Sequence, residues 1–160
     1  MRFYLIDRIN KIEIGKSIEG IKCWSLSDEI FTEHFPGYPI VPGVLLIESM
    51  AQLLGFLVEK SYLVEFPNPY GVHVILGMVH KAKFREIVIP GDRCEIRGKL
   101  KSIDINRCNG NAKVYVDGNL IAESDLSFVI ISKKDLPENK FIERRKEFIH
   151  IISNKWHNRK

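Results

Sequence analysis

The feature that most constrains the fold is a long apolar segment, residues 44–63, which follows a loop rich in proline and glycine. Apolar side chains point in nearly every direction around a helix drawn through this segment, and a helix that is apolar all round is buried. Pro42 and Gly43 stand at its start. Because proline suits neither a helix interior nor a central strand, Pro36 and Pro39 indicate a loop before it. The sequence therefore predicts one long helix enclosed by other elements.

Strand-like segments make up most of the remaining chain. Apolar and polar residues alternate, between turn residues, in the segments 3–14, 18–26, 72–84, 92–103, 113–116 and 120–131. Asn109-Gly110 and Asp117-Gly118 are dipeptides typical of hairpin turns. A single helical turn is expected over 28–33. One early helix among five or six antiparallel strands favours an α+β domain.

The end of the chain differs from the rest. Apolar residues recur at three- and four-residue steps within 137–156, which predicts an amphipathic helix. Residues 133–160 carry 9 Lys and Arg against 4 Asp and Glu, whereas residues 1–132 carry 15 against 16. We therefore divide the chain into a main domain, 1–132, and a basic helical extension, 133–160. The extension either meets an acidic partner or is solvated, and its helix packs on its own subunit or a neighbour.

Length and composition describe one ordinary globular domain. The chain has 160 residues, of which 45% are hydrophobic and 28% charged. No segment approaches the roughly 18 apolar residues of a membrane span, and residues 1–20 do not have the pattern of a signal peptide. Cys23, Cys94 and Cys108 form no CxxC pair and are interpreted as reduced thiols. These observations predict a cytoplasmic protein without a membrane span.

One acidic residue stands out inside the apolar segment. Apart from Gln52, Glu48 is the only strongly polar side chain between residues 41 and 56. Burying an ionised carboxylate costs several kcal/mol or more. Glu48 is therefore protonated, paired with a cation, or used in a reaction.

The segment around Glu48 resembles a known enzyme family. Residues 34–52 read HFPGYPIVPGVLLIESMAQ, and the beta-hydroxyacyl-acyl carrier protein dehydratases of the hotdog fold have the motif HFPGxPxxPGVLxxExxAQ. The resemblance extends over 5–131, including Leu5-Ile6-Asp7-Arg8, Lys81-Ala82-Lys83-Phe84-Arg85 and Pro90-Gly91-Asp92. A sister family that also isomerises its product has Asp in place of Glu48, so the resemblance favours the plain dehydratase. Tyr38 departs from the residues that the family often carries there.

The resemblance implies a fold and a reaction. The fold would be a long central helix wrapped by a curved antiparallel sheet, with an extra C-terminal helix. The reaction would be that of a hydro-lyase, which removes water from (3R)-hydroxyacyl-carrier protein to give the trans-2-enoyl thioester in fatty acid or related acyl-chain synthesis. His34 would be the base that removes the C2 proton, since imidazole titrates near neutral pH. Glu48 would supply the proton to the leaving hydroxyl.

Three further residues are candidates for substrate orientation. Gly43 and Val44 open the helix, where free backbone N–H groups favour the negative charge that develops on a thioester oxygen. Gln52 lies one helical turn beyond Glu48 and could orient its carboxyl group. The alternatives are structural: a loop histidine with satisfied hydrogen bonds, an acid paired with Lys or Arg, a glycine that simply starts a helix, and an amide that satisfies the backbone.

The expected partners are a carrier protein and a second copy of the chain. Basic side chains beside the strand that ends at Phe84 are candidates for docking an acidic acyl carrier protein, or else they protect a sheet edge; they are Lys81, Lys83, Arg85, Arg93 and Arg97. The resembled family forms homodimers in which each site takes its His from one subunit and its acid from the other. Whether dimers assemble further, for instance as a trimer of dimers, stays open.

The sequence argues against several functional classes and leaves two alternatives to the dehydratase. Neither metal-ligand spacing nor a phosphate-binding glycine loop occurs, so we expect no metal, no other cofactor and no nucleic acid partner. A hotdog acyl thioesterase is the enzymatic alternative, although thioesterases lack the HFPG arrangement. A non-catalytic acyl-thioester-binding subunit is the other, but it would normally have lost His34 or Glu48. Acyl chain length, and the choice between carrier protein and coenzyme A, are left open.

Overall fold

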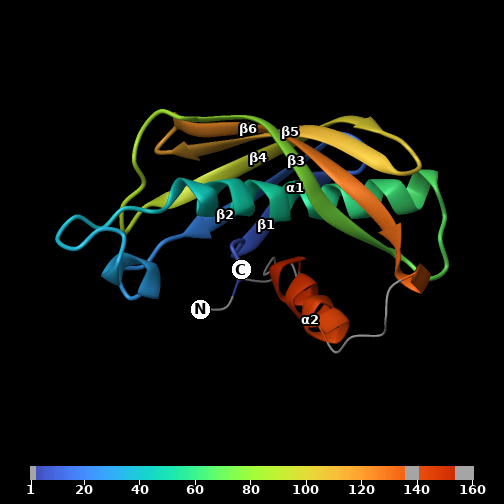
Figure 1. Cartoon of the computed structure of the whole chain (residues 1–160), viewed down its shortest axis with the longest axis horizontal. Coiled ribbons are helices and arrows are strands. Elements are labelled where there is room, and N and C mark those ends of the chain that lie inside the picture. The colour runs from blue at the N-terminus through green and yellow to red at the C-terminus, as the bar shows by residue number, and fades with distance from the viewer. Residues whose placement is uncertain (1–2, 136–140, 154–160) are drawn as a thin grey trace, which may run out of the picture.

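The computed structural model describes residues 3–135 and 141–153, and in the second range it describes side chains from residue 146 onward. The elements run β1 (Arg8–Glu13), β2 (Ser17–Cys23), η1 (Glu29–Thr32), α1 (Gly43–Glu65), β3 (Val72–Phe84), β4 (Arg93–Ile103), β5 (Arg107–Val116), β6 (Asn119–Ser132), η2 (Lys133–Asp135) and α2 (Phe141–Ser153). The strands form one antiparallel sheet in the order β1-β2-β4-β5-β6-β3. Figure 1 shows the sheet curving around α1, with α2 on the side of α1 that the sheet leaves open.

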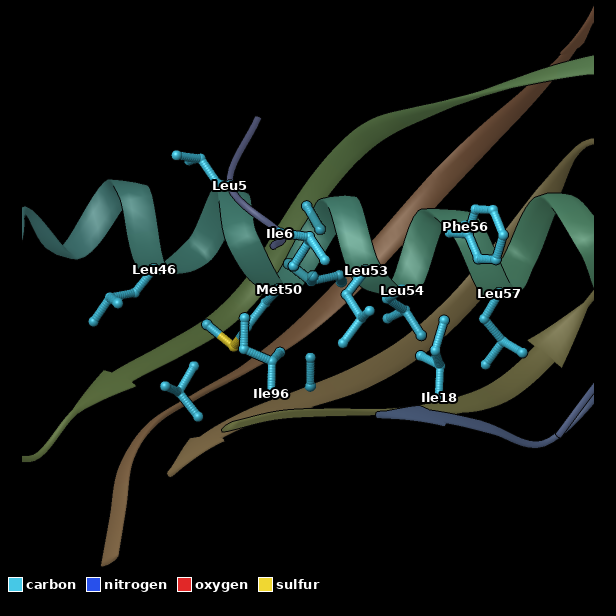
Figure 2. Close-up of a cluster of buried hydrophobic side chains, with 14 of the residues drawn as sticks. Leu5, Ile6, Ile18, Leu46, Met50, Leu53, Leu54, Phe56, Leu57 and Ile96 are labelled. Atoms are coloured by element: carbon cyan, nitrogen blue, oxygen red, sulfur yellow. The ribbon is translucent and has the colours of Figure 1, made fainter. Parts of the chain in front are cut away.

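Helix α1 is the centre of the hydrophobic core. It begins directly after Pro42, whose carbonyl oxygen accepts a hydrogen bond from Leu45 N at 2.9 Å. Leu54 and Leu57 are fully buried, and Figure 2 shows both pointing toward the strands that carry Ile18 and Ile96. The helix is two residues longer at its end than the sequence predicted, and the prediction of a buried, enclosed helix is confirmed.

Glycines on β2, β4 and β5 let the helix approach the sheet, and the one on β4 is Gly98, where a Cβ atom would stand 3.2 Å from Leu54 Cδ1. A Cβ atom on Gly110 of β5 would stand 2.7 Å from Leu54 Cδ2, and one on Gly20 of β2 would stand 2.8 Å from Leu53 Cδ1. The predicted turn at Asn109-Gly110 is wrong, because β5 runs through both residues. The chain reverses at 104–106 instead, where Asp104 N donates to Arg107 O at 2.8 Å. Gly110 is thus explained by close packing and not by a turn.

The other predicted elements are mostly confirmed. Strand β3 has the expected bounds, the short helical turn appears as η1, and six strands form. The turn at Asp117-Gly118 is present, with φ of 49° and 83° at its two residues. Such positive φ values are those of a type I′ hairpin turn, which Asp and Gly tolerate.

The start of the chain departs from its prediction. A strand was expected over 3–14, but β1 begins only at Arg8. Leu5 and Ile6, both 2% exposed, belong to the same core as α1. Two consecutive residues cannot both face one side of a strand. Residues 3–6 therefore cross α1 as an irregular segment. Neither helix within the described parts of the chain is long and apolar enough to cross a membrane.

Candidate active site

Glu48 lies on α1 in a half-buried position. Gln52, one helical turn later, donates a hydrogen bond from Nε2 to Glu48 Oε1 at 2.9 Å. Among the described residues, no Lys, Arg or His pairs with the Glu48 carboxyl group. By contrast, Glu59 on the same helix is buried and stands 3.7 Å from Lys133 Nζ. Within the described residues, the structure therefore gives no support to the alternative in which Glu48 is paired with Lys or Arg.

Gln52 connects the carboxyl group to the start of the chain. Its Oε1 accepts a hydrogen bond from Leu5 N at 2.9 Å, and its Nε2 also donates to Phe3 O at 3.1 Å. The sequence left two interpretations of Gln52, an amide that orients Glu48 and an amide that satisfies the backbone. The structure agrees with both, since Gln52 contacts Glu48 and also bonds to backbone groups. The oxygen and the nitrogen of the Gln52 amide both have hydrogen-bond partners, so the amide can be oriented in only one way. This orientation points Nε2 at the Glu48 carboxyl group.

Glu48 and Gln52 form the polar part of an otherwise apolar cavity of about 400 Å³. Side chains from α1, β3, β6, the start of the chain and α2 line it: Phe3, Tyr4, Ile6, Ile9, Glu48, Ala51, Gln52, Leu53, Gly55, Phe56, Val74, Leu76, Phe128, Phe148, Ile149 and Ile152. A largely apolar cavity with few polar groups is the usual form of a small-molecule site. This one could take a hydrocarbon chain with a reactive end at the carboxyl.

His34 lies in the loop between η1 and α1, and local hydrogen bonds set its orientation. Its backbone N–H donates to Ile30 O at 3.1 Å, and its Nδ1 lies 3.0 Å from Ile40 O. A carbonyl oxygen can only accept, so Nδ1 carries a proton, and in the neutral imidazole the lone pair is therefore on Nε2. The Phe35 ring stacks on the imidazole with centroids 4.1 Å apart. This is the tautomer that a general base at Nε2 requires.

The structure does not bring His34 into the Glu48 cavity of the same subunit. His34 is absent from the described residues that line this cavity. The two residues therefore lie in separate settings within one chain: one on the buried helix, the other in a loop whose residues 35–38 are exposed.

The start of α1 is tightly packed at Gly43. A Cβ atom there would lie 3.0 Å from two carbons of the Phe84 ring at the end of β3. Val44, the next residue, is 69% exposed. Their N–H groups belong to the first turn of the helix, where no earlier helical carbonyl can accept them. Backbone N–H groups without a helical acceptor are what an anion-binding position requires.

The five predicted docking cations do not form one cluster. Lys81 and Lys83 lie near the end of β3 and Arg85 follows it directly, whereas Arg93 and Arg97 lie on β4. Two strands of the sheet separate these groups. The sequence could not show that β3 pairs with β6 at the far edge of the sheet. Acidic neighbours also reduce the positive charge of both groups.

Ion pairs cover the outer face of the sheet beside these cations. Arg85 Nη2 lies 2.8 Å from Glu123 Oε1, and the hydrogen bond from this guanidinium lowers the pKa of the Glu123 carboxyl. Arg97 Nη2 lies 3.4 Å from Glu95 Oε2 and stacks on Tyr115. Pairs of this kind also serve to protect a sheet surface, so the two interpretations of these cations stay open.

Other reactive side chains lie outside the cavity. Burial raises the pKa of the Cys94 and Cys108 thiols to about 12, which keeps them protonated near neutral pH and makes them poor nucleophiles. No group of three or more His, Cys, Asp or Glu side chains in the described ranges is arranged to hold a metal ion.

Sequence reasoning missed two parts of the cavity wall. Phe3 and Tyr4 line it because the start of the chain crosses α1, and the unbroken apolar run over residues 3–6 was the available signal. Phe148, Ile149 and Ile152 come from α2, whose apolar stripe was recognised but not its destination. Nothing in the sequence shows which surface such a stripe covers.

Comparison with known proteins places the chain in a family. The model of the FabA-like domain matches residues 1–125. A 3-hydroxyacyl-(acyl-carrier-protein) dehydratase FabZ from a Nitratiruptor species is 41% identical over 139 residues, covering 82% of this chain and 89% of that protein. The FabZ dehydratase from Campylobacter curvus is 42% identical over 132 residues, with the same coverage.

A solved structure supports the fold alone. A thioesterase from Haemophilus influenzae superimposes with a TM-score of 0.57 at 11% identity, covering 76% of each chain. A fold shared at such low identity does not choose between dehydratase and thioesterase.

Proposed function

The chain belongs to the FabA-like domain family, and we propose on this premise that it is a 3-hydroxyacyl-acyl carrier protein dehydratase. This hydro-lyase converts a 3-hydroxyacyl thioester into the trans-2-enoyl thioester and water, within fatty acid or related acyl-chain synthesis. The named relatives at 41% and 42% identity support the reaction. The structural observation that carries the proposal is the Glu48 carboxyl group at the polar part of an apolar cavity, with no cation paired to it among the side chains that the structure describes.

The roles of the two central residues follow from their hydrogen bonds. The lone pair on His34 Nε2 takes the proton from C2, because Nδ1 is committed to Ile40 O. The electrons of the C2–H bond move toward the thioester carbonyl, whose oxygen gains negative charge. The C3–O bond then breaks as Glu48 donates a proton to the leaving hydroxyl. The products are the enoyl thioester and water, and the proton on His34 restores Glu48 through solvent.

The N–H groups of Gly43 and Val44 serve the intermediate stage. Negative charge on the thioester oxygen is stabilised by backbone donors at a helix N-terminus, and the helix dipole adds to this effect. Gly43 has no side chain, and the Phe84 ring packs against the position that a Cβ atom would take. Gln52 is a positioning residue, since it contacts the Glu48 carboxyl group and not the reacting atoms.

We infer that a complete site needs two subunits. His34 does not line the Glu48 cavity of its own chain. Strand β3 is an edge of the sheet, and it exposes apolar side chains, among them Ile75 (45%), Met78 (56%) and Val79 (40%). An exposed apolar edge of this kind suits pairing with a second sheet. A homodimer joined at β3 would let His34 of one subunit approach the Glu48 cavity of the other.

The substrate carrier and compartment belong to the same proposal. Lys81, Lys83 and Arg85 are the better candidates for contact with an acidic acyl carrier protein, because Phe84 between them touches the start of α1. Arg93 and Arg97 are the weaker candidates. We place the enzyme in the cytoplasm, which agrees with three free cysteines. Residues 1–132 form the dehydratase domain and residues 133–160 an extension of it.

Product analysis tests this function. The protein is incubated with 3-hydroxyacyl-carrier proteins and the corresponding coenzyme A thioesters, and the acyl groups are weighed by mass spectrometry. A dehydratase yields an acyl group lighter by one water, still attached to its carrier. Release of free acid would identify a thioesterase instead, and an unchanged acyl group that stays bound would identify a non-catalytic binding subunit.

A further inference from the structure

Helix α2 contributes a wall to the cavity that contains Glu48. Phe148, Ile149 and Ile152 line this cavity, although α2 lies beyond residues 1–125, which match the family model. The Phe148 ring stacks on Tyr4 with centroids 3.9 Å apart and planes 11° from parallel, and Ile152 is buried. These two contacts hold the side of α2 that carries Ile149 against the rest of the domain. Figure 1 shows α2 beside the open side of α1.

The cavity is elongated along α1. Six residues of α1 line it: Glu48, Ala51, Gln52, Leu53, Gly55 and Phe56. All of them except Leu53 are related by three- and four-residue steps and so share one face of the helix. Eight residues separate Glu48 from Phe56, which is roughly 12 Å along a helix. A chain attached to a reacting group at Glu48 would therefore run along α1 toward Phe56.

A second hollow adjoins the far part of this cavity. It has a volume of about 420 Å³ and is lined by Ile9, Asn10, Lys11, Ile12, Ile14, Phe56, Lys60, Ile149 and Ser153. Three of these side chains, Ile9, Phe56 and Ile149, also line the Glu48 cavity. Residues that line two adjoining spaces form the partition between them.

We propose that Ile149, with Ile9 and Phe56, sets the length of the acyl chain that the enzyme accepts. This inference rests on the proposed function, and it assigns a specificity role to a helix outside the family match. An acyl chain that reaches the partition can extend only by displacing these side chains. Ile149 is the most informative of the three to change, because it is half-buried on a surface helix, whereas Phe56 belongs to the core and Ile9 to the sheet.

The test compares two isoleucines on the same helix. Ile149→Ala removes carbon atoms from the partition and joins the two hollows, while Ile151→Ala makes the same change at a position that is 63% exposed. The kcat/KM of the full chain is measured with 3-hydroxyacyl-carrier proteins from four to sixteen carbons. For Ile149→Ala we expect the ratio of long-chain to short-chain kcat/KM to rise about tenfold, the scale of one or two methylenes in an apolar pocket. For Ile151→Ala the ratio should equal that of the unmodified protein.

A larger side chain gives the opposite change. Ile149→Phe should lower the same ratio of long-chain to short-chain kcat/KM. Because a selectivity ratio does not respond to a uniform loss of folded protein, this variant also decides the matter if Ile149→Ala folds poorly. Ratios that stay level in both Ile149 variants, while the unmodified protein dehydrates its substrates, overturn the role of Ile149 and leave the proposed function intact.

A binding measurement separates the two proposals. Octanoyl- and hexadecanoyl-carrier proteins lack the 3-hydroxyl group and cannot react, so calorimetry reports their affinity alone. Ile149→Ala should bind the longer chain more tightly, relative to the shorter one, than the unmodified protein does. If no 3-hydroxyacyl substrate is dehydrated, the proposed function fails, and this affinity ratio still supports or contradicts the partition.

Discussion

The two halves of the candidate site are built in different ways. Glu48 sits on a helix held by the core, and its partner Gln52 bonds to Leu5, 47 residues away in sequence. His34 is oriented by Ile30 and Ile40, both within six residues of it. The position of the acid thus depends on the packing of the whole domain, whereas that of the histidine depends on a short loop. Substitutions in the His34 loop should therefore change activity with little effect on stability. Substitutions that disturb the packing around Glu48 and Gln52 should change stability as well.

His34→Ala should have the largest effect on activity and almost none on stability. General acid–base groups are typically worth about 10²–10⁴-fold, and kcat/KM should fall within this range. The melting temperature should stay nearly unchanged, since the ring contacts only its own loop. Kinetics and thermal unfolding of the same preparation check this. A large drop in melting temperature would mean that the loop supports the core.

Glu48→Gln should lower kcat/KM by a similar factor while stability stays level or rises. A neutral amide of equal size removes the cost of a desolvated carboxylate, and its oxygen can still accept the bond from Gln52. The measurement is again kcat/KM beside thermal unfolding. Near-normal turnover with a much lower melting temperature would make Glu48 a structural residue and would contradict the mechanism.

Gln52→Ala should reduce stability more than either of these changes and activity less. It leaves Leu5 N, a buried backbone donor, without its acceptor, which costs about 1–3 kcal/mol. Turnover should fall because the Glu48 carboxyl group loses its defined orientation. Denaturant unfolding gives the free energy, and kcat at saturating substrate gives the positioning effect. Unchanged stability would show that the start of the chain is held by other contacts.

Tyr38→Ala should have the smallest effect of the series. The side chain is 59% exposed, and the bonds between Tyr38 and Phe35 join backbone atoms that the substitution keeps. A surface change of this kind usually alters stability by less than about 0.5 kcal/mol. Denaturant unfolding of Tyr38→Ala and Gln52→Ala under the same conditions gives the two losses of stability. A comparable loss in both variants would contradict the view that the loop contributes less to stability than the helix.

Much of the fold could be predicted because the signals are local. Residues 44–63 had to be a buried helix, and Asp117-Gly118 had to be a turn, because apolar periodicity and φ preference act within a few residues. The turn predicted at Asn109-Gly110 was wrong, because the sequence does not distinguish a glycine that allows close packing against Leu54 from a glycine in a turn. Residues 3–6 misled because their path depends on α1, far away in the sequence.

The sequence was enough to name the candidate site residues, but not to show how they are arranged in space. His34, Gly43, Val44, Glu48 and Gln52 all belong to one continuous motif, so the resemblance named them together. That Phe148 and Ile149 line the same cavity depends on where α2 packs, which the amphipathic pattern does not specify. The five docking cations were grouped by sequence distance, but the sheet order separates them.

The central claim is that the acid and the base act together across two subunits. Its most direct test mixes inactive His34→Ala and Glu48→Gln proteins, with subunit exchange followed by mass spectrometry of differently tagged chains. Hybrid dimers contain one site with both residues, so random exchange should restore about one quarter of normal activity, while each variant alone stays inactive. No recovery after complete exchange would show that His34 and Glu48 meet within one chain.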